Sequence, residues 1–251
     1  VDQVNYDRIL EIYADRFADA SDFTFFFVGN IDVDAMKPLI AQYLGALPDK
    51  QRKEAAIDRK MDILPGTRVK EYAKEMQTPT ATTIMVYSGK ESYNLRNNVL
   101  MDFLTQALDM VFTDEVREKE GGTYGVSSYG SLNKYPHEVA LMQIVYQTDP
   151  TKKEKLNTLI DELVKKMAAE GPTPEQMQKV RDYMVKQYND NQKENSYWIS
   201  SLDEYYYTGI DFNADYLNIV NSVTAADVKA FATDLIQQGN KVTVVLTTID
   251  N

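Results

Sequence analysis

The stretch Arg117-Glu118-Lys119-Glu120-Gly121-Gly122-Thr123-Tyr124-Gly125 links a predicted helix to a predicted strand. Upstream of it, apolar residues recur at helical spacing, and we expect this amphipathic helix to run to about Arg117. Gly121 and Gly122 then stop the helix, and a strand begins at Tyr124. A basic helix end, a glycine turn and a strand start therefore follow one another directly.

Further strands are predicted on both sides of this connection. Residues 67–76 are polar enough for an edge strand, and residues 80–88 are rich in β-branched side chains. Residues 124–135 and 139–146 are separated by a short turn, which predicts an antiparallel hairpin. A last strand is expected at residues 242–246, after a Gly-Asn turn.

The first fifty residues predict a helix, a strand and a second helix. Residues 3–17 carry apolar side chains at helical spacing, and residues 23–28 (FTFFFV) are expected to form a buried strand. Asp32 or Asp34 then caps a helix. The inner face expected for this second helix consists of Met36, Leu39, Ile40 and Tyr43.

The last hundred residues are mostly helical. Three helix starts are marked by capping residues: Thr151 with Glu154, Thr173 before a proline, and Thr224 with Asp227. Strands and helices thus cluster without regular alternation. This order predicts an α+β fold, a mainly antiparallel sheet with helices packed on one face.

The expected domain organisation is a connecting helix followed by one domain. Residues 1–19 form the connecting helix, and residues 20–251 form a single α+β domain. Within that domain, residues 49–66 are charged and lack a clear period, which predicts an internal loop. Because the chain begins at Val1 within a helical pattern, we interpret it as a piece of a longer polypeptide.

Composition excludes several functions. The chain has 38 acidic and 27 basic residues and a net charge of −11, which argues against nucleic acid and anionic membranes as partners. No apolar run is long enough to span a membrane. There is no cysteine and one histidine, His137, so disulfides, thiolate chemistry and a zinc site in this chain are not expected. We interpret His137 as a hairpin-turn residue that faces water.

Arg117 and Tyr124 are the candidate site residues. An arginine side chain is a planar cation with five donors, suited to holding a carbonyl or carboxylate. A tyrosine hydroxyl can donate to an oxyanion. From the residues alone, a helix end followed by a strand start is the simpler explanation of the same stretch.

Two stretches resemble the pitrilysin-like zinc proteases, also called inverzincins. One is the pattern R-E-K-x-G-x-x-Y at residues 117–124, and the other runs from F-F-F-V-G-N-I-D at 25–32 to L-I-x-x-Y-L-G-x-L-P at 39–48. The resemblance covers residues 20–248, nearly the whole chain. It also agrees with the predicted order of the elements.

The resemblance implies a domain that positions substrate without binding zinc. In that family the two halves of the enzyme close like a clamshell, and one half carries H-x-x-E-H and the zinc, a motif absent from this chain. The other half contributes an arginine and a tyrosine seven residues apart. Arg117 is thereby expected to hold the backbone of a peptide substrate, and Tyr124 to stabilise the oxyanion at the scissile carbonyl. The expected partner is the catalytic half, in the same polypeptide or as a separate subunit.

Alternatives follow from the missing zinc motif. Some relatives are non-catalytic scaffold or binding subunits of the processing-peptidase or core-protein type, and the R-E-K pattern also occurs in the second domain of some catalytic halves. A third hypothesis is a stand-alone peptide-binding domain that uses the aromatic residues Tyr197, Trp198 and Tyr205 to Tyr207. Helix–helix packing is the simpler explanation of that cluster. For a bacterial source we expect a soluble protein of the periplasm or the cytoplasm.

Overall fold

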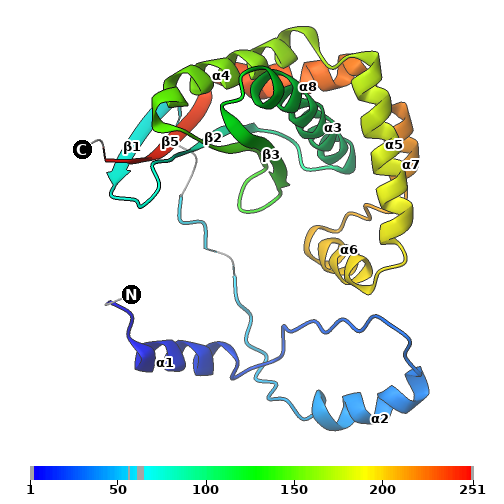
Figure 1. Ribbon diagram of the computed structural model, residues 1–251. Helices are drawn as coiled ribbons and strands as arrows, with labels where there is room; N and C mark the ends of the chain where they lie inside the picture. Colours follow the sequence, from blue (N-terminus) through cyan, green and yellow to red (C-terminus); the bar gives the residue numbers. More distant parts are fainter. Residues whose placement is uncertain (1–2, 56, 61–64, 250–251) are drawn as a thin grey trace.

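A five-stranded sheet forms the centre of the described chain, which comprises residues 3–55, 57–60 and 65–249 of the computed structural model (Figure 1). Predictions for residues 1–2, 56, 61–64 and 250–251 lie outside this part. The strands are β1 (Thr67–Lys74), β2 (Ala81–Lys90), β3 (Thr123–Asn133), β4 (Val139–Thr148) and β5 (Asn240–Thr248). Each of them was expected from the sequence.

The strand order is β1-β5-β2-β4-β3, so the last strand of the chain lies inside the sheet. β5 pairs with β1 in parallel and with β2 antiparallel, while β2, β4 and β3 form antiparallel ladders. The exposed strand β1 is at one edge, as its polar sequence predicted. The sheet is therefore mainly antiparallel, which confirms the prediction.

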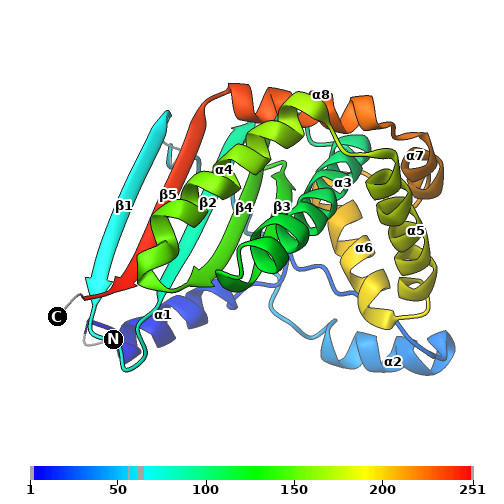
Figure 2. The same cartoon turned by 45° about the horizontal axis from the view of Figure 1, so that its top comes forward.

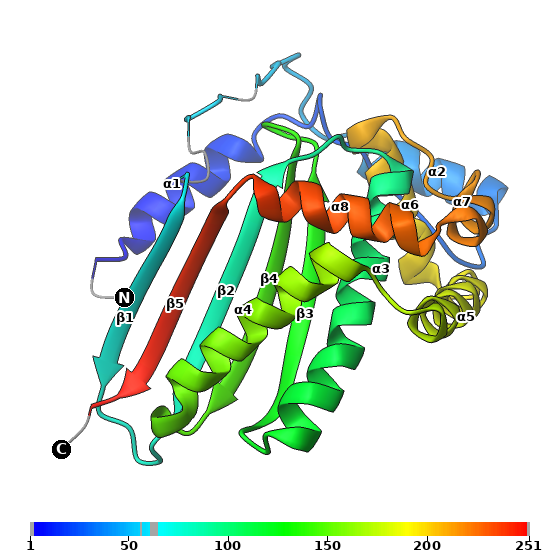
Figure 3. The ribbon, with the colours of Figure 1, turned by 90° about the horizontal axis from the view of Figure 1, so that it is seen from above.

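Helices cover one face of this sheet. α3 (Leu95–Phe112), α4 (Lys153–Glu170) and α8 (Ala225–Gln237) lie across it, as Figure 3 shows from above. α5 (Pro174–Asn191) and α7 (Tyr216–Ser222) pack against α3 on its outer side. The core between these layers is apolar, and its largest fully buried side chains include Phe103, Leu108, Phe112, Met142 and Tyr146. The α+β fold with helices on one face is confirmed.

Two of the three predicted helix caps are formed. Thr173 and Thr224 each accept the N3 backbone N–H, and the side chains at N3 return the bond, so both capping boxes are complete. The cap expected at Thr151 is wrong. Asp149 instead accepts the Thr151 N–H at 2.8 Å and begins a 3₁₀ turn, η2 (Pro150–Lys152), from which α4 continues.

The first fifty residues depart most from expectation. α1 (Tyr6–Arg16) and α2 (Val33–Tyr43) form, with Asp32 as the α2 N-cap, but neither helix has a buried residue. Both lie apart from the sheet and its helices (Figure 1). The predicted inner face of α2 is exposed, because no element of the described chain covers it.

The buried strand predicted at residues 23–28 is also wrong. This segment carries no strand hydrogen bonds, and its side chains are exposed or half-exposed. An extended segment becomes a strand only when its backbone groups find a partner strand.

Candidate functional site

A π-helix, η1 (Thr113–Lys119), carries Arg117. The sequence predicted one regular helix to about Arg117, but the α-helical part of it ends at Phe112. The Thr113 hydroxyl donates to the Asp109 carbonyl oxygen at 2.8 Å at the changeover, a local bond that competes with regular helix geometry. Segments of π-helix are rare and frequently occur at functional sites.

Gly121 and Gly122 turn the chain from η1 into β3. Gly121 has φ +57°, a left-handed conformation that only glycine adopts without strain. Gly122 passes close to Leu156 of α4, where an added Cβ would lie 3.0 Å from the nearest methyl group. The Thr148 hydroxyl donates to the Gly122 carbonyl oxygen at 2.5 Å and ties the turn to the end of β4.

Tyr124 lies in an irregular part of the edge strand β3. The β3–β4 register shifts between Thr123 and Val126, so the backbone bulges at Tyr124 and Gly125. The Thr123 hydroxyl donates to the Gln147 carbonyl oxygen at 2.6 Å and accepts the Gly125 N–H at 3.2 Å, which holds the bulge. Such bulges redirect side chains, and the Tyr124 side chain is 100% exposed.

The Arg117 side chain is also available to a ligand. Its side chain is 56% exposed, and its Nε lies 3.7 Å from a carboxylate oxygen of the equally exposed Glu118. Exposed pairs of this kind are weak. Neighbouring charges have closer partners: Lys119 binds Glu115 at 2.8 Å, and Lys155 binds Glu120. Among the basic side chains at this helix end, Arg117 therefore has the longest ion-pair distance.

Arg117 and Tyr124 thus belong to one junction. Both flank the glycine turn, and Thr123, which precedes Tyr124, pairs with Thr148 at the sheet end that includes Ala81. Arginine supplies a permanent positive charge with several donors, and tyrosine supplies a hydroxyl donor. Together they suit an extended backbone or a carbonyl oxygen that gains negative charge. Both residues are candidates from the sequence analysis, and no sequence signal predicted the π-helix that carries Arg117 or the bulge at Tyr124.

The described residues do not fit a zinc ion. No group of three or more histidine, cysteine, aspartate and glutamate residues within residues 3–55, 57–60 and 65–249 could hold a metal. His137, the single histidine of the sequence, lies in the β3–β4 turn, and its Nε2 is 3.5 Å from a carboxylate oxygen of Asp58.

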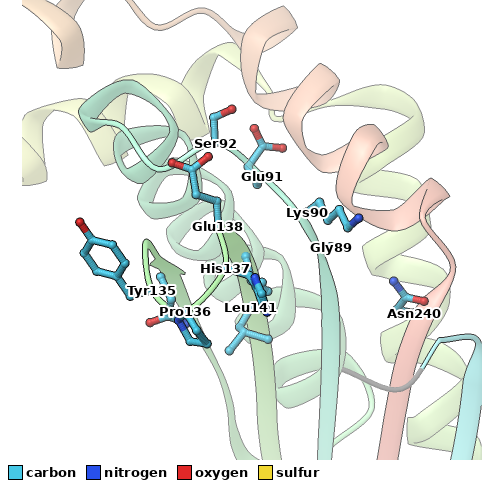
Figure 4. A pocket seen from close by; sticks show the side chains of 12 residues that line it. Gly89, Lys90, Glu91, Ser92, Tyr135, Pro136, His137, Glu138, Leu141 and Asn240 are labelled. Atoms are coloured by element: carbon cyan, nitrogen blue, oxygen red, sulfur yellow. The ribbon is translucent and has the colours of Figure 1, made fainter. Parts of the chain in front are cut away.

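A hollow of about 890 Å³ lies at the opposite end of the sheet from Tyr124. Figure 4 shows Glu91, Ser92 and Glu138 grouped at its rim, with Asn240 on the other side. The backbone N–H of Glu91 donates to the Glu138 carbonyl oxygen at 3.4 Å and joins the two segments. The hollow includes His137 but neither of the predicted site residues.

The aromatic cluster of α6 (Asn195–Thr208) divides into two parts. Tyr197 packs edge-on against Tyr188 of α5 and donates to Asn213, as the packing interpretation expects. Tyr205, Tyr206 and Tyr207 are instead 50–65% exposed. Packing within the chain therefore explains Tyr197 but not the exposure of Tyr205, Tyr206 and Tyr207.

The chain is an α+β layer with an exposed arginine and an exposed tyrosine, and its described part lacks a metal-ligand group. This is the form of the non-catalytic half of a zinc protease-like protein. Residues 3–184 match the family described as the peptidase M16 inactive domain. The chain belongs to this family, which confirms the resemblance to the pitrilysin-like proteases.

Similar proteins support this assignment. The chain is 28% identical over 172 residues to the "Probable zinc protease PqqL" of Escherichia coli K12, which covers 65% of this chain and 18% of that protein. This chain thus spans about a fifth of that curated relative. The crystal structure of a peptidase M16 inactive domain from Pseudomonas fluorescens has a TM-score of 0.76 at 17% identity, covering 99% of this chain and 59% of that one.

The same fold also occurs in the first half of a relative. The crystal structure of the first half of the periplasmic protease PqqL from Escherichia coli has a TM-score of 0.67 at 11% identity. The match covers 89% of this chain and 50% of that one. In the described part of the present chain, no helix is long and apolar enough to cross a membrane.

Proposed function

We propose that this chain is the substrate-positioning portion of a zinc endopeptidase and does not cleave peptides alone. The observation that carries the proposal is the full exposure of Tyr124 on a bulged edge strand, across the glycine turn from the exposed Arg117. A tyrosine that contributes no burial to its own domain is free to contact a bound molecule. The catalytic half, with its zinc, is supplied by the same polypeptide or by a partner subunit.

In this proposal each residue has a separate task. Arg117 binds carbonyl oxygens of an extended peptide and fixes its position along β3. The Tyr124 hydroxyl donates a hydrogen bond to the scissile carbonyl oxygen as negative charge develops there. The glycine turn sets the relative placement of the two side chains. For a bacterial source we propose the periplasm, the compartment of the relative PqqL.

The test is Tyr124→Phe in the longer parent polypeptide, assayed with a peptide substrate. Removal of one oxyanion donor costs about 3–4 kcal/mol, so we expect kcat to fall on the order of 100-fold or more. Tyr129→Phe is the matched control, because Tyr129 lies on the same strand and is 60% exposed. A loss below about threefold for Tyr124→Phe would remove the assigned role.

The competing function is a non-catalytic scaffold subunit. The lack of a metal-ligand group in the described residues fits it as well. The native gene product distinguishes the two. A polypeptide several times larger than this chain, with about one zinc per molecule, is expected for the protease. A product of similar size, or a larger one without zinc, favours the scaffold and leaves Arg117 and Tyr124 without a role in catalysis.

A further inference from the structure

The bulge of β3 lies in the edge strand of the sheet, next to β4 (Figure 2). The register of the β3–β4 ladder shifts between Thr123 and Val126. Two residues of β3, Tyr124 and Gly125, therefore lie opposite a single residue of β4, Gln147. The extra residue is left out of the ladder, so other bonds must hold the backbone here.

The direction of the Tyr124 side chain depends on this backbone. The side chain is 100% exposed, so no packing within the described part of the chain restricts it. Gly125 follows directly, and glycine has more backbone freedom than any other residue. A Cβ added at Gly125 would meet nothing within 4 Å, so tight packing does not fix this position either. Hydrogen bonds to the bulge are therefore what can hold Tyr124 in one orientation.

The Thr123 hydroxyl makes two of these hydrogen bonds. It donates to the Gln147 carbonyl oxygen at 2.6 Å and accepts the Gly125 N–H at 3.2 Å. The Gly125 carbonyl oxygen also lies 3.0 Å from the hydroxyl, but a hydroxyl has one proton, and the Gln147 oxygen is nearer. One side chain thus joins the residue after Tyr124 to the opposite strand.

A second hydroxyl, that of Thr148, holds the other side of the bulge. It donates to the Gly122 carbonyl oxygen at 2.5 Å, and Thr148 is only 6% exposed. This bond ends before Tyr124 in the sequence. The backbone after Tyr124 therefore depends on Thr123, whose hydroxyl reaches past the tyrosine to Gly125.

Strand formation alone does not account for a hydroxyl at position 123. Valine has the same branched shape as threonine and suits a strand as well, but its side chain can neither donate nor accept a hydrogen bond. The hydroxyl matters if Tyr124 is an oxyanion donor, because such a donor is effective only when it is in place before the charge develops. A misplacement of about 1 Å in a catalytic site can cost roughly 100-fold in rate.

We propose that Thr123 is a positioning residue of the proposed site. Its hydroxyl holds the bulge in the form that directs the Tyr124 hydroxyl toward the scissile carbonyl of a bound peptide. Thr123 touches neither the peptide nor the zinc, and it acts through Tyr124 alone. The inference rests on the role proposed above for Tyr124. It extends that role, because without the Thr123 hydroxyl the bulge can take several forms, and the tyrosine donor is in place for only part of the time.

Peptide cleavage by the longer parent polypeptide tests the proposal. Thr123→Val keeps the shape of the side chain and removes the hydroxyl, so kcat should fall roughly tenfold or more. KM should change by less than about twofold, since Arg117 is expected to bind the peptide in the ground state. Thr123→Ser keeps the hydroxyl and should retain kcat within about threefold.

A double-mutant cycle shows whether Thr123 acts through Tyr124. In the Tyr124→Phe background, Thr123→Val should lower kcat by less than about twofold, because no donor remains to be positioned. A loss as large as in the unmodified parent would overturn the inference. If Tyr124→Phe alone lowers kcat and Thr123→Val does not, the inference is wrong and the proposed function stands. If Tyr124→Phe has no effect, the proposed function is wrong, and Thr123 has no donor to position.

Hydrogen exchange of the Gly125 amide gives a readout that does not depend on activity. In the 251-residue chain, Thr123→Val removes the acceptor of this N–H, so its exchange should become about fivefold faster or more. Thr123→Ser should leave the rate nearly unchanged. Equal rates in both variants and in the unmodified chain would show that the hydroxyl does not hold the bulge. If Thr123→Val does not fold, Thr123→Ala removes the same hydroxyl.

Thr248→Val is the matched control. The Thr248 hydroxyl also makes two backbone hydrogen bonds, donating to the Thr80 carbonyl oxygen at 3.1 Å and accepting the Thr80 N–H at 2.8 Å. It lies at the end of β5, which is separated from β3 by β2 and β4. Both kcat and the exchange of the Gly125 amide should therefore stay unchanged. If Thr248→Val lowers kcat as much as Thr123→Val does, the effect is a general loss of stability, and Thr123 has no specific role.

Discussion

Tyr87 and Lys241 face each other across the antiparallel β2–β5 ladder, and both donate a hydrogen bond to the same carboxylate oxygen of Asp161. The Tyr87 hydroxyl lies 2.7 Å from this oxygen and the Lys241 Nζ lies 2.5 Å from it. Asp161 belongs to α4, so one carboxylate joins the helical layer to two central strands. Lys165 binds the other oxygen at 2.7 Å.

We expect Asp161→Asn to destabilise the domain by about 2–3 kcal/mol, because the variant weakens hydrogen bonds to a charged group and leaves the Lys241 ammonium without its counter-charge. The Lys241 side chain is only 18% exposed, so water compensates little. Urea unfolding measures the loss. Glu175→Gln is the control, since its pair with Lys179 is exposed and the change should leave the unfolding midpoint nearly unchanged.

The same carboxylate predicts a pH dependence. Burial alone would raise the pKa of Asp161, but hydrogen bonds from Lys165, Lys241 and Tyr87 lower it from 3.8 to about 2. A lowered pKa stabilises the fold above the unfolded value, and this contribution, roughly 2 kcal/mol, is lost as the pH falls through the folded value. Unfolding curves of the unmodified chain and of Asp161→Asn should therefore converge between about pH 4 and pH 2. A constant difference over this range would contradict the assignment.

The elements whose partners lie within the chain were predictable. The helix stripe before Arg117, the alternation after Tyr124 and the capping residues Thr173 and Thr224 are local signals, and the core that they build is complete. Such signals succeed when local preference and tertiary packing agree. They identified the sheet and its helical layer, whereas Arg117 and Tyr124 became candidate site residues through the resemblance to the protease family.

The predictions that were wrong concern segments whose structure depends on contacts that a local sequence pattern does not show. FTFFFV has the composition of a buried strand, but no described strand lies beside it. The π-helix and the β3 bulge depend on hydrogen bonds of Thr113 and Thr123 to carbonyl oxygens, which residue types alone do not reveal. Thr151 lost its predicted cap because Asp149, two residues earlier, accepts its N–H first. For FTFFFV, the β3 bulge and Thr151, the missing information concerns a partner outside the stretch that was interpreted.

The glycine turn yields a prediction with a matched control. Gly121→Ala introduces a Cβ that meets nothing within 4 Å, so its cost, about 1 kcal/mol, is the strain of φ +57° alone. Gly125→Ala also meets nothing within 4 Å, but Gly125 lacks a positive φ and its replacement should be neutral or slightly stabilising. Urea unfolding of both variants checks the difference. Equal costs would show that the turn does not depend on the left-handed conformation.

Arg117→Lys tests whether substrate binding at the proposed site requires the guanidinium group or only a positive charge. Lysine keeps the charge but loses the planar set of donors that binds two carbonyl oxygens at once. Hydrogen bonds to a charged group contribute about 1.5–3 kcal/mol, so the parent should lose roughly tenfold or more in kcat/KM, mainly through KM.

Lys119→Ala is the control for Arg117→Lys, because Lys119 lies on the same π-helix, is similarly exposed and is paired with Glu115. It should leave peptide cleavage nearly unchanged. If the two variants lose activity equally, the loss is not specific to the Arg117 guanidinium group, and the role assigned to that group is wrong. If Arg117→Lys has no effect, a positive charge at this position is sufficient for substrate binding. The peptide must then be aligned by backbone groups of the edge strand β3.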